Sequence, residues 1–263
     1  MRPNKFYRNV GLCLCCLLCV ILAACQPVSN TEIPQPTPTA TQTPIPTATI
    51  DWFPPTLTPT LKYATVTPDP LSSLTPPPAG KVLFEDEFLD QSFWEVSSSQ
   101  AGNIAFGENY LSLAVAGNQA SLTSLSSYSL PSEFYLELSA EVTMCSPNDT
   151  YSIIFWHFSE MGTYQVRYSC SGEMRVERTI YDSTSVLQNW VQARRFQPDS
   201  PAQNRLGIWA ANGTLHFFVN DTYQFSLQVT PGLSGGMGVS AKAAGEQAAT
   251  VLFSDLIVYQ PQP

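Results

Sequence analysis

The chain has 263 residues and is acidic, because 21 Asp and Glu outnumber 12 Lys and Arg and give a formal net charge of −9 at pH 7. An acidic surface repels phosphate backbones and anionic lipid head groups, so this balance argues against nucleic acid as a partner. Five of the seven cysteines lie within the first 25 residues, and only Cys145 and Cys170 lie beyond them.

The first 24 residues have the pattern of an export signal. Arg2, Lys5 and Arg8 precede an apolar run of 15 residues, 10–24. A basic start, an apolar stretch and small residues before a cleavage site define a signal peptide. The run closes with Leu22-Ala23-Ala24-Cys25, which resembles a bacterial lipobox. This resemblance implies cleavage after residue 24 and a lipid anchor, with diacylglycerol on the thiol and fatty acids such as palmitate.

Two alternatives compete with a lipobox. An uncleaved transmembrane anchor needs about 20 apolar residues, which is more than this run provides. An ordinary signal peptide would leave a small residue, and not Cys25, at the start of the mature chain. We therefore expect a protein held at the membrane through Cys25, in the cell envelope and on its extracytoplasmic side.

Residues 25–80 have the composition of a linker. Between residues 26 and 79 lie 14 of the 22 prolines of the chain, interspersed with threonines. Proline lacks a backbone donor and fixes φ, so neither a helix nor a sheet propagates through such a tract. The sequence predicts a disordered, extended spacer, with an upper reach of about 170 Å at 3.1 Å per residue. A single domain over residues 81–263 follows it.

The domain shows a hydrophobic period of two. In residues 134–144, Phe134, Leu136 and Leu138 alternate with Tyr135, Glu137 and Ser139, and residues 164–169 and 215–219 repeat the pattern. Turn-forming residues recur about every ten positions, and no segment has the pattern of a capped amphipathic helix. Many short strands at this spacing predict an all-β sandwich or barrel.

Several short motifs carry a resemblance to a known superfamily. They occupy residues 83–88, 151–156, 204–206, 213–220, 236–239 and 253–258. In this order they resemble the concanavalin A-like lectin and glucanase superfamily, in particular its laminin-G-like and 3-keto-disaccharide-hydrolase-like branches. The resemblance implies a two-sheet jelly roll, and it supports a fold more strongly than an activity.

Cys145 and Cys170 are the two thiols left after processing besides Cys25. In an oxidising compartment such a pair predicts a disulfide. If residues 134–144, 150–159 and 162–169 formed one meander, the two cysteines would lie two strands apart, about 9–10 Å, which is too far for a bridge. The pairing therefore requires that the chain bend past the strand ends.

Four residues are candidates for ligand binding. Trp156 follows Phe155 at a position where related domains carry a polar residue on the concave sheet, and Arg167, Arg175 and Glu177 are expected on neighbouring strands. An aromatic ring with flanking hydrogen-bonding groups suits a sugar. The alternative is that Trp156 belongs to the core.

Related family 16 glycosidases carry their catalytic glutamates in the pattern E-x-D-x-E. Here Glu137 and Glu141 are present, but Ser139 stands where the aspartate belongs. Residues four apart on a regular strand lie about 13 Å apart, whereas retaining hydrolysis needs carboxyls about 5–5.5 Å apart. The alternative for both glutamates is a solvated strand face.

Asp255 on the last strand resembles an aspartate that holds a structural Ca²⁺ in relatives, and Glu87 of the acidic run 85–87 would lie beside it if the termini pair. A turn without metal is the alternative, and no other cofactor is expected. The sequence thus predicts a monomeric, non-catalytic carbohydrate-binding domain. The alternatives are a glycoside hydrolase acting on 3-keto-disaccharides or related glycans, and an adhesion module that binds an envelope protein.

Overall fold

The computed structural model describes residues 74–158, 162–198, 200–230 and 234–261. The predicted signal peptide, Cys25 and nearly all of the predicted linker lie outside the described residues. Every described residue belongs to one compact unit, Tyr63–Pro263. In this part of the chain, no helix has the length and apolar character needed to cross a membrane.

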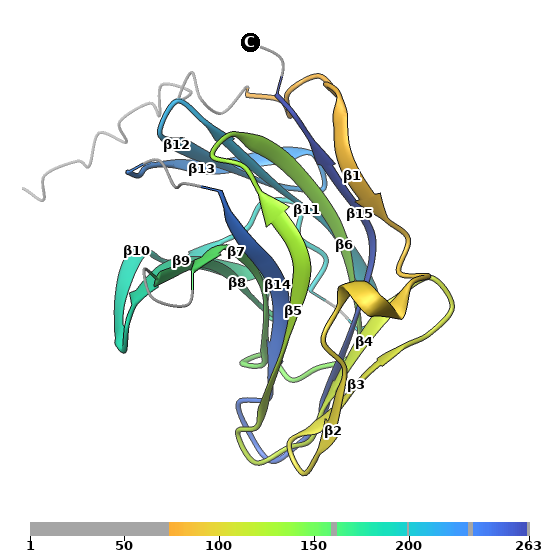
Figure 1. The fold of residues 1–263 in the computed structure, drawn as a ribbon. Helices are drawn as coiled ribbons and strands as arrows, with labels where there is room; N and C mark the ends of the chain where they lie inside the picture. Colours follow the sequence, from red (N-terminus) through yellow and green to blue (C-terminus); the bar gives the residue numbers. More distant parts are fainter. Residues whose placement is uncertain (1–73, 159–161, 199, 231–233, 262–263) are drawn as a thin grey trace, which may run out of the picture. The chain divides into compact units, whose positions relative to one another are not determined.

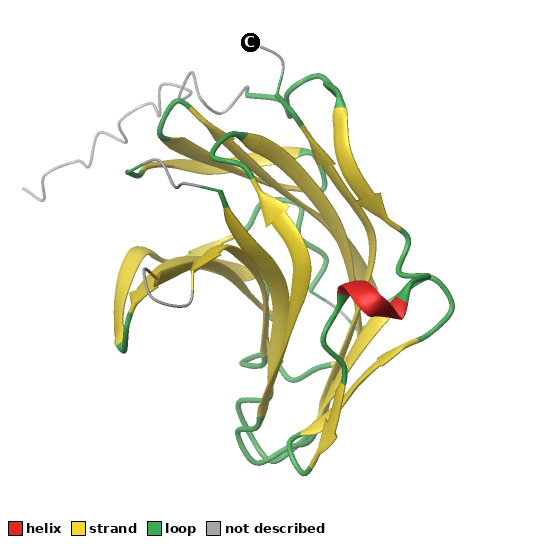
Figure 2. Cartoon of the chain, in the orientation of Figure 1, coloured by secondary structure: helices red, strands yellow, loops and turns green. Residues whose placement is uncertain are grey.

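The described residues form β-strands joined by turns, with one short helical element, the 3₁₀ turn η2 (Figure 2). The elements are β1 Val82–Asp86, η2 Gln91–Phe93, β2 Ser97–Ser99, β3 Gly102–Phe106, β4 Leu111–Val115, β5 Ser121–Leu130, β6 Phe134–Met144, β7 Thr150–Phe158, β8 Gly162–Ser169, β9 Glu173–Ile180, β10 Ser183–Gln192, β11 Ala202–Ala211, β12 Thr214–Val219, β13 Thr222–Gln228, β14 Gly235–Lys242 and β15 Ala249–Tyr259. The predicted all-β class is confirmed.

The strands form two antiparallel sheets packed face to face (Figure 1). The nine-stranded sheet has the order β13-β12-β11-β6-β15-β4-β3-β2, and β1 pairs with β15. The six-stranded sheet has the order β10-β9-β8-β7-β14-β5. Consecutive strands β6 and β7 lie in different sheets, as do β14 and β15, and such crossings between sheets are typical of a jelly roll. The predicted two-sheet sandwich is therefore confirmed.

The core lies between the two sheets and follows the period-two pattern. On β6, Phe134, Leu136 and Leu138 are fully buried, and on β7, Ile153 and Phe155 are fully buried as well. Inner faces of packed sheets interdigitate in this way, and each large apolar side chain buried stabilises the fold by about 1.5–3 kcal/mol. The inward face of each strand is thereby fixed, and the intervening residues face outward.

Trp156 lies in this core, as the alternative for it predicted, and its place on the concave sheet surface is therefore wrong. Its backbone φ is +46°, and the pairing of β7 with β8 shifts register between Phe155 and Phe158. A β-bulge of this kind interrupts the alternation and turns Trp156 to the same side as Phe155. The indole is 1% exposed, and its Nε1 donates a hydrogen bond of 2.8 Å to the carbonyl of Pro131.

The predicted disulfide between Cys145 and Cys170 is confirmed, with their Cα atoms 6.2 Å apart. The distance problem disappears because β6 does not pair with β7. Cys145 follows β6 of the nine-stranded sheet, and Cys170 follows β8 of the six-stranded sheet. The bridge therefore connects the ends of two strands from opposite layers of the sandwich.

The two ends of the domain pair with each other through β1 and β15, where Asp86 lies opposite Leu256. The Asp86 side chain is buried and accepts hydrogen bonds of 2.7 Å from the Phe88 backbone N–H and from Trp94 Nε1. Asp86 thus fixes the turn after β1, because its carboxylate satisfies two buried donors.

Candidate functional site

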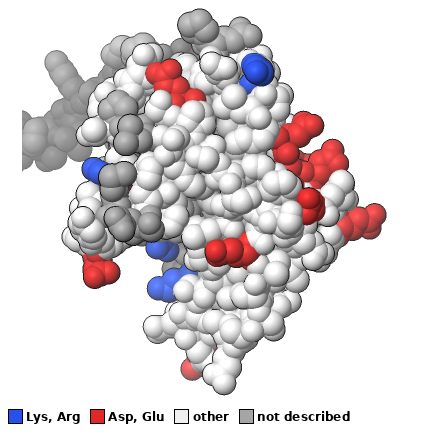
Figure 3. Space-filling view, viewed as in Figure 1, with Lys and Arg blue, Asp and Glu red and all other residues white. Residues whose placement is uncertain are grey.

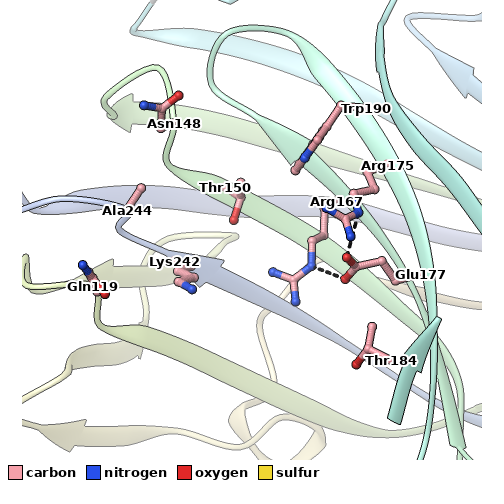
Figure 4. A pocket seen from close by; sticks show the side chains of 10 residues that line it. All are labelled: Gln119, Asn148, Thr150, Arg167, Arg175, Glu177, Thr184, Trp190, Lys242 and Ala244. Atoms are coloured by element: carbon pink, nitrogen blue, oxygen red, sulfur yellow. Dashed lines mark hydrogen bonds and ion pairs between the residues drawn. The ribbon is translucent and has the colours of Figure 1, made fainter. Parts of the chain in front are cut away.

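The outer face of the six-stranded sheet contains a hollow of about 570 Å³ (Figure 4). This volume lies within the range of about 300–1,000 Å³ found for small-molecule sites. Strands β7, β8, β9, β10 and β14 all contribute to it, together with the turns that flank them. The lining residues are Gln119, Asn148, Thr150, Arg167, Arg175, Glu177, Thr184, Trp190, Lys242 and Ala244.

A cluster of three charged residues lies on one side of the hollow. Arg167 on β8 and Arg175 on β9 are cross-strand partners, and both contact Glu177, which lies two residues after Arg175 on the same face of β9. Arg167 Nε donates a hydrogen bond of 2.8 Å to Glu177 Oε2. Arg175 Nε lies 2.8 Å from Glu177 Oε1, an ion pair without the alignment of a hydrogen bond. Both carboxylate oxygens are therefore engaged by guanidinium groups, which holds the two arginines in place.

Trp190 on β10 forms the neighbouring wall. The guanidinium carbon of Arg175 lies over its ring, 5.8 Å from the centroid, which is within the range of a cation–π interaction. The indole is half-buried, so part of its surface is open to the hollow. The wall thus offers an aromatic surface directly beside the charged cluster.

Polar side chains continue across the same face of the sheet. Gln165 Nε2 donates hydrogen bonds to Ser152 Oγ and Ser240 Oγ, at 2.5 and 3.0 Å, and joins β8 to β7 and β14. These groups satisfy one another, so the sheet surface next to the hollow is polar and fixed before any ligand arrives.

The charge of the hollow differs from that of the chain as a whole. Its lining includes the three cations Arg167, Arg175 and Lys242 but only one carboxylate, that of Glu177. The space-filling view shows Lys and Arg side chains at a notch on its left side, while a group of acidic side chains lies along its right side (Figure 3). The acidic surface therefore has a locally positive recess.

The structure brings together three of the four residues predicted to bind a ligand. Arg167, Arg175 and Glu177 line the hollow, and Trp156 does not. Trp190 supplies the aromatic wall in its place, and Lys242 adds a charge that the sequence analysis missed. Residues 183–192 could have been predicted as a strand that contains Trp190. However, the pairing of β10 with β9 has two register shifts, so simple alternation does not show which residues of β10 face outward.

Glu137 and Glu141 lie elsewhere. Both are on β6 of the nine-stranded sheet, on the face away from the core, and neither lines the hollow. Glu137 accepts a hydrogen bond of 2.8 Å from the Tyr135 hydroxyl. Burial, followed by the charge of Glu137, raises the pKa of Tyr135 well above its usual value. Glu137 and Glu141 therefore lie as residues of the outer face of a strand, which is the alternative given for them.

The calcium prediction rested on pairing of the chain ends, and β1 and β15 do pair. Asp255 occupies a bulge of β15 with φ +52°, where its carboxylate accepts a hydrogen bond of 2.9 Å from Ser254 Oγ, and Glu87 is exposed. Among the described residues, no group of three or more His, Cys, Asp or Glu side chains is arranged to hold a metal ion. The Ca²⁺ site stays a prediction, because backbone carbonyls would have to complete it.

No protein-family model matches the sequence, and no curated protein matches it. Among solved structures, the laminarinase catalytic domain of Thermotoga maritima has a TM-score of 0.55 at 7% identity, covering 71% of this chain and 100% of that one. The β-glucanase of Bacillus licheniformis has a TM-score of 0.53 at 8% identity, with coverages of 70% and 99%. A galectin-like protein of unknown function from Bacillus subtilis has a TM-score of 0.52 at 12% identity, with coverages of 70% and 98%.

The described domain therefore shares its two-sheet jelly-roll fold with these solved structures, as the resemblance found in the sequence implied. At identities this low the likeness extends to the fold alone. What the domain binds must be argued from the hollow.

Proposed function

We propose that the protein is a non-catalytic carbohydrate-binding module and that a glycan binds in the hollow of the six-stranded sheet. The observation that carries the proposal is the wall formed by Trp190, Arg175 and Glu177, with Arg167 beside it. An aromatic ring packs against the apolar C–H face of a sugar, and the charged groups hydrogen-bond its hydroxyls. Because ion pairs already hold these side chains, little conformational entropy is lost on binding.

The carboxylates of the hollow favour binding over hydrolysis. Glycosidases use two carboxyl groups, about 5–5.5 Å apart in retaining enzymes and about 6.5–9.5 Å apart in inverting ones. Glu177 is the one carboxylate among the lining residues, and both of its oxygens are engaged by arginines. Glu137 and Glu141 project from the other sheet, so they do not complete a pair with it.

The structural relatives support a glycan as the ligand class. The fold is shared with a laminarinase and a β-glucanase, both named for enzymes of polysaccharide breakdown. This chain presents its own wall of side chains on a sheet of the same fold, and a glycan is the ligand class that these names suggest.

The same proposal includes display of the module outside the cell. The sequence Leu22-Ala23-Ala24-Cys25 supports acylation at Cys25, and the Pro/Thr-rich segment supports a spacer between lipid and domain. We expect a Cys25→Ser variant to leave the membrane fraction and to lose incorporation of a labelled fatty acid. Retention of both properties would contradict the anchor.

Binding is tested with the full chain on a glycan array. We expect Trp190→Ala to weaken binding at least tenfold, because it removes the aromatic surface. Trp209→Ala is the matched control, since Trp209 lies on β11 of the other sheet. Thermal unfolding of both variants monitors the fold.

Three results would contradict the proposal. Binding that survives Trp190→Ala would remove the hollow as the site. Release of new reducing ends from a bound glycan would identify a hydrolase instead. Crosslinking to an envelope protein, without affinity for any sugar, would identify an adhesion module.

A further inference from the structure

The charge balance of the hollow indicates more than sugar binding in general. Its three cations face one carboxylate, so two positive charges remain uncompensated among the lining side chains. The chain as a whole carries a formal net charge of −9. A recess with the opposite sign to the rest of the surface focuses the field on ligands of matching charge.

Arg167 directs its free hydrogen-bonding groups into the hollow. Its Nε is used by Glu177, and Figure 4 shows the two terminal nitrogens on the far side of the guanidinium, toward Lys242. Among the residues that the structure describes, no side chain or backbone oxygen accepts a hydrogen bond from these nitrogens. The planar fork that recognises a carboxylate, sulfate or phosphate is therefore free.

Lys242 supplies the second cation from across the sheet. It lies on β14 opposite Thr150 of β7, and Arg167 lies on β8 opposite Ser152 of the same strand. Two strand spacings and an offset of two residues along the strands separate their Cα atoms by about 12 Å, a gap that both long side chains reach into. Lys242 is exposed, and among the described residues no carboxylate lies within 4.0 Å of its ammonium group.

We infer that the glycan bound in the hollow is acidic, with an anionic substituent held between the terminal nitrogens of Arg167 and the ammonium group of Lys242. The inference rests on the proposed function and specifies its ligand class. A charge-assisted hydrogen bond is about twice as strong as a neutral one, so a carboxylate or sulfate binds these two cations more strongly than a hydroxyl does. Glu177 keeps Arg167 pointing into the hollow by holding its Nε.

The site also suits a chain of sugars better than a single one. Trp190 on β10 and Lys242 on β14 are separated by β9, β8 and β7. Four strand spacings amount to about 19 Å, so a ligand that contacts both residues crosses the strands as an oligosaccharide. Elsewhere the acidic surface repels such a polymer, which confines binding to the hollow.

The test compares acidic glycans with neutral forms of the same backbone, using the full chain and isothermal titration calorimetry. Polygalacturonate against its methyl ester isolates a carboxylate, and dextran sulfate against unmodified dextran isolates a sulfate. We expect at least one acidic form to bind about tenfold more tightly than its partner, the factor that corresponds to about 1.4 kcal/mol.

Variants then locate the anionic group. Lys242→Gln should remove most of the preference for the acidic form, because the affinity for that form falls further than the affinity for the neutral form. Lys81→Gln is the matched control, because Lys81 is exposed and does not line the hollow. Trp190→Ala should weaken both forms alike.

The outcomes separate the two proposals. If neutral and acidic forms bind equally and Lys242→Gln changes nothing, the ligand is a neutral glycan, and only the inference of an acidic ligand is overturned. If Lys81→Gln lowers the preference as much as Lys242→Gln does, the preference comes from diffuse charge, and the inference also fails. If no glycan binds at all, the proposed function fails together with it.

Discussion

The outer faces of the two sheets belong to one sandwich but have opposite character. The six-stranded sheet presents ion pairs, a half-buried indole and a hollow of about 570 Å³. The nine-stranded sheet presents a second aromatic cluster, with Tyr135, Phe218 and Tyr223 buried and Leu74, Trp209 and Tyr259 packed around them. One face is open and hollowed, and the other carries this aromatic cluster beside the carboxylates of Glu137 and Glu141. The same alternation along a strand can therefore produce a binding surface or a covered one, depending on which side chains stand at the outward positions.

The largest expected effect concerns the bridge that connects the two layers. Replacing Cys145 and Cys170 by serine removes a crosslink with a sequence separation of 25 residues. On the chain-entropy model the free energy of unfolding should fall by about 3–4 kcal/mol. Urea denaturation of oxidised, reduced and double-serine proteins measures it. A loss that appears only in the variant and not on reduction would contradict a bridge.

The next effect compares one substitution on both outer faces. Glu177→Gln leaves two half-buried guanidinium groups without a counter-charge and should lower the free energy of unfolding by about 2 kcal/mol. Glu137→Gln keeps an acceptor for the Tyr135 hydroxyl and should cost well under 1 kcal/mol. Only Glu177→Gln should also weaken glycan binding. Equal costs for the two variants would remove the distinction between the faces.

A smaller effect tests how the nine-stranded sheet is covered. Leu74 is half-buried against the aromatic cluster, so Leu74→Ala should lower the free energy of unfolding by about 1 kcal/mol. Leu89→Ala is the matched control, because Leu89 is 67% exposed. Neither variant should change glycan affinity. If Leu74→Ala changed the free energy of unfolding as little as Leu89→Ala does, the contact of Leu74 with the aromatic cluster would not stabilise the fold.

The smallest effect is a pH dependence confined to the filled face. The ring of His216 lies 4.8 Å from that of Trp209, centroid to centroid, and burial lowers the pKa of His216 below its usual value of 6.5. The unfolded chain therefore takes up a proton first as the pH falls, so stability is full above about pH 6.5 and declines below it. Thermal unfolding between pH 7.5 and 5, with His216→Gln as reference, measures the slope. If His216→Gln leaves the dependence of the melting temperature on pH unchanged, other titratable groups cause that dependence.

Regular strands could be predicted from the sequence because burial of one face imposes a period of two. The predicted segments 134–144 and 162–169 coincide with β6 and β8. The charged residues on β8 and β9 were placed for the same reason, since Arg167 and Arg175 follow an unbroken alternation. Where a strand is regular, sequence parity gives the direction of its side chains.

Side-chain direction cannot be predicted from the alternation of residues where a strand contains a β-bulge. The alternation along β7 predicts that the Trp156 side chain points outward. Its positive φ, which is unusual for a residue other than glycine, turns the side chain inward, and nothing in the local sequence signals this. Trp190 was missed because β10 is an edge strand with two register shifts. The disulfide geometry was misjudged for a different reason, since the sheet to which each strand belongs depends on long-range pairing.

The contact of Leu74 with the nine-stranded sheet also decides where a force on the amino-terminal end of the described chain would act. The described chain enters the domain at residue 74, against the outer face of one layer, while the hollow opens on the outer face of the other. A pull on the amino-terminal side is thus transmitted to the back of the module. A glycan bound in the hollow would instead contact the layer that does not carry Leu74.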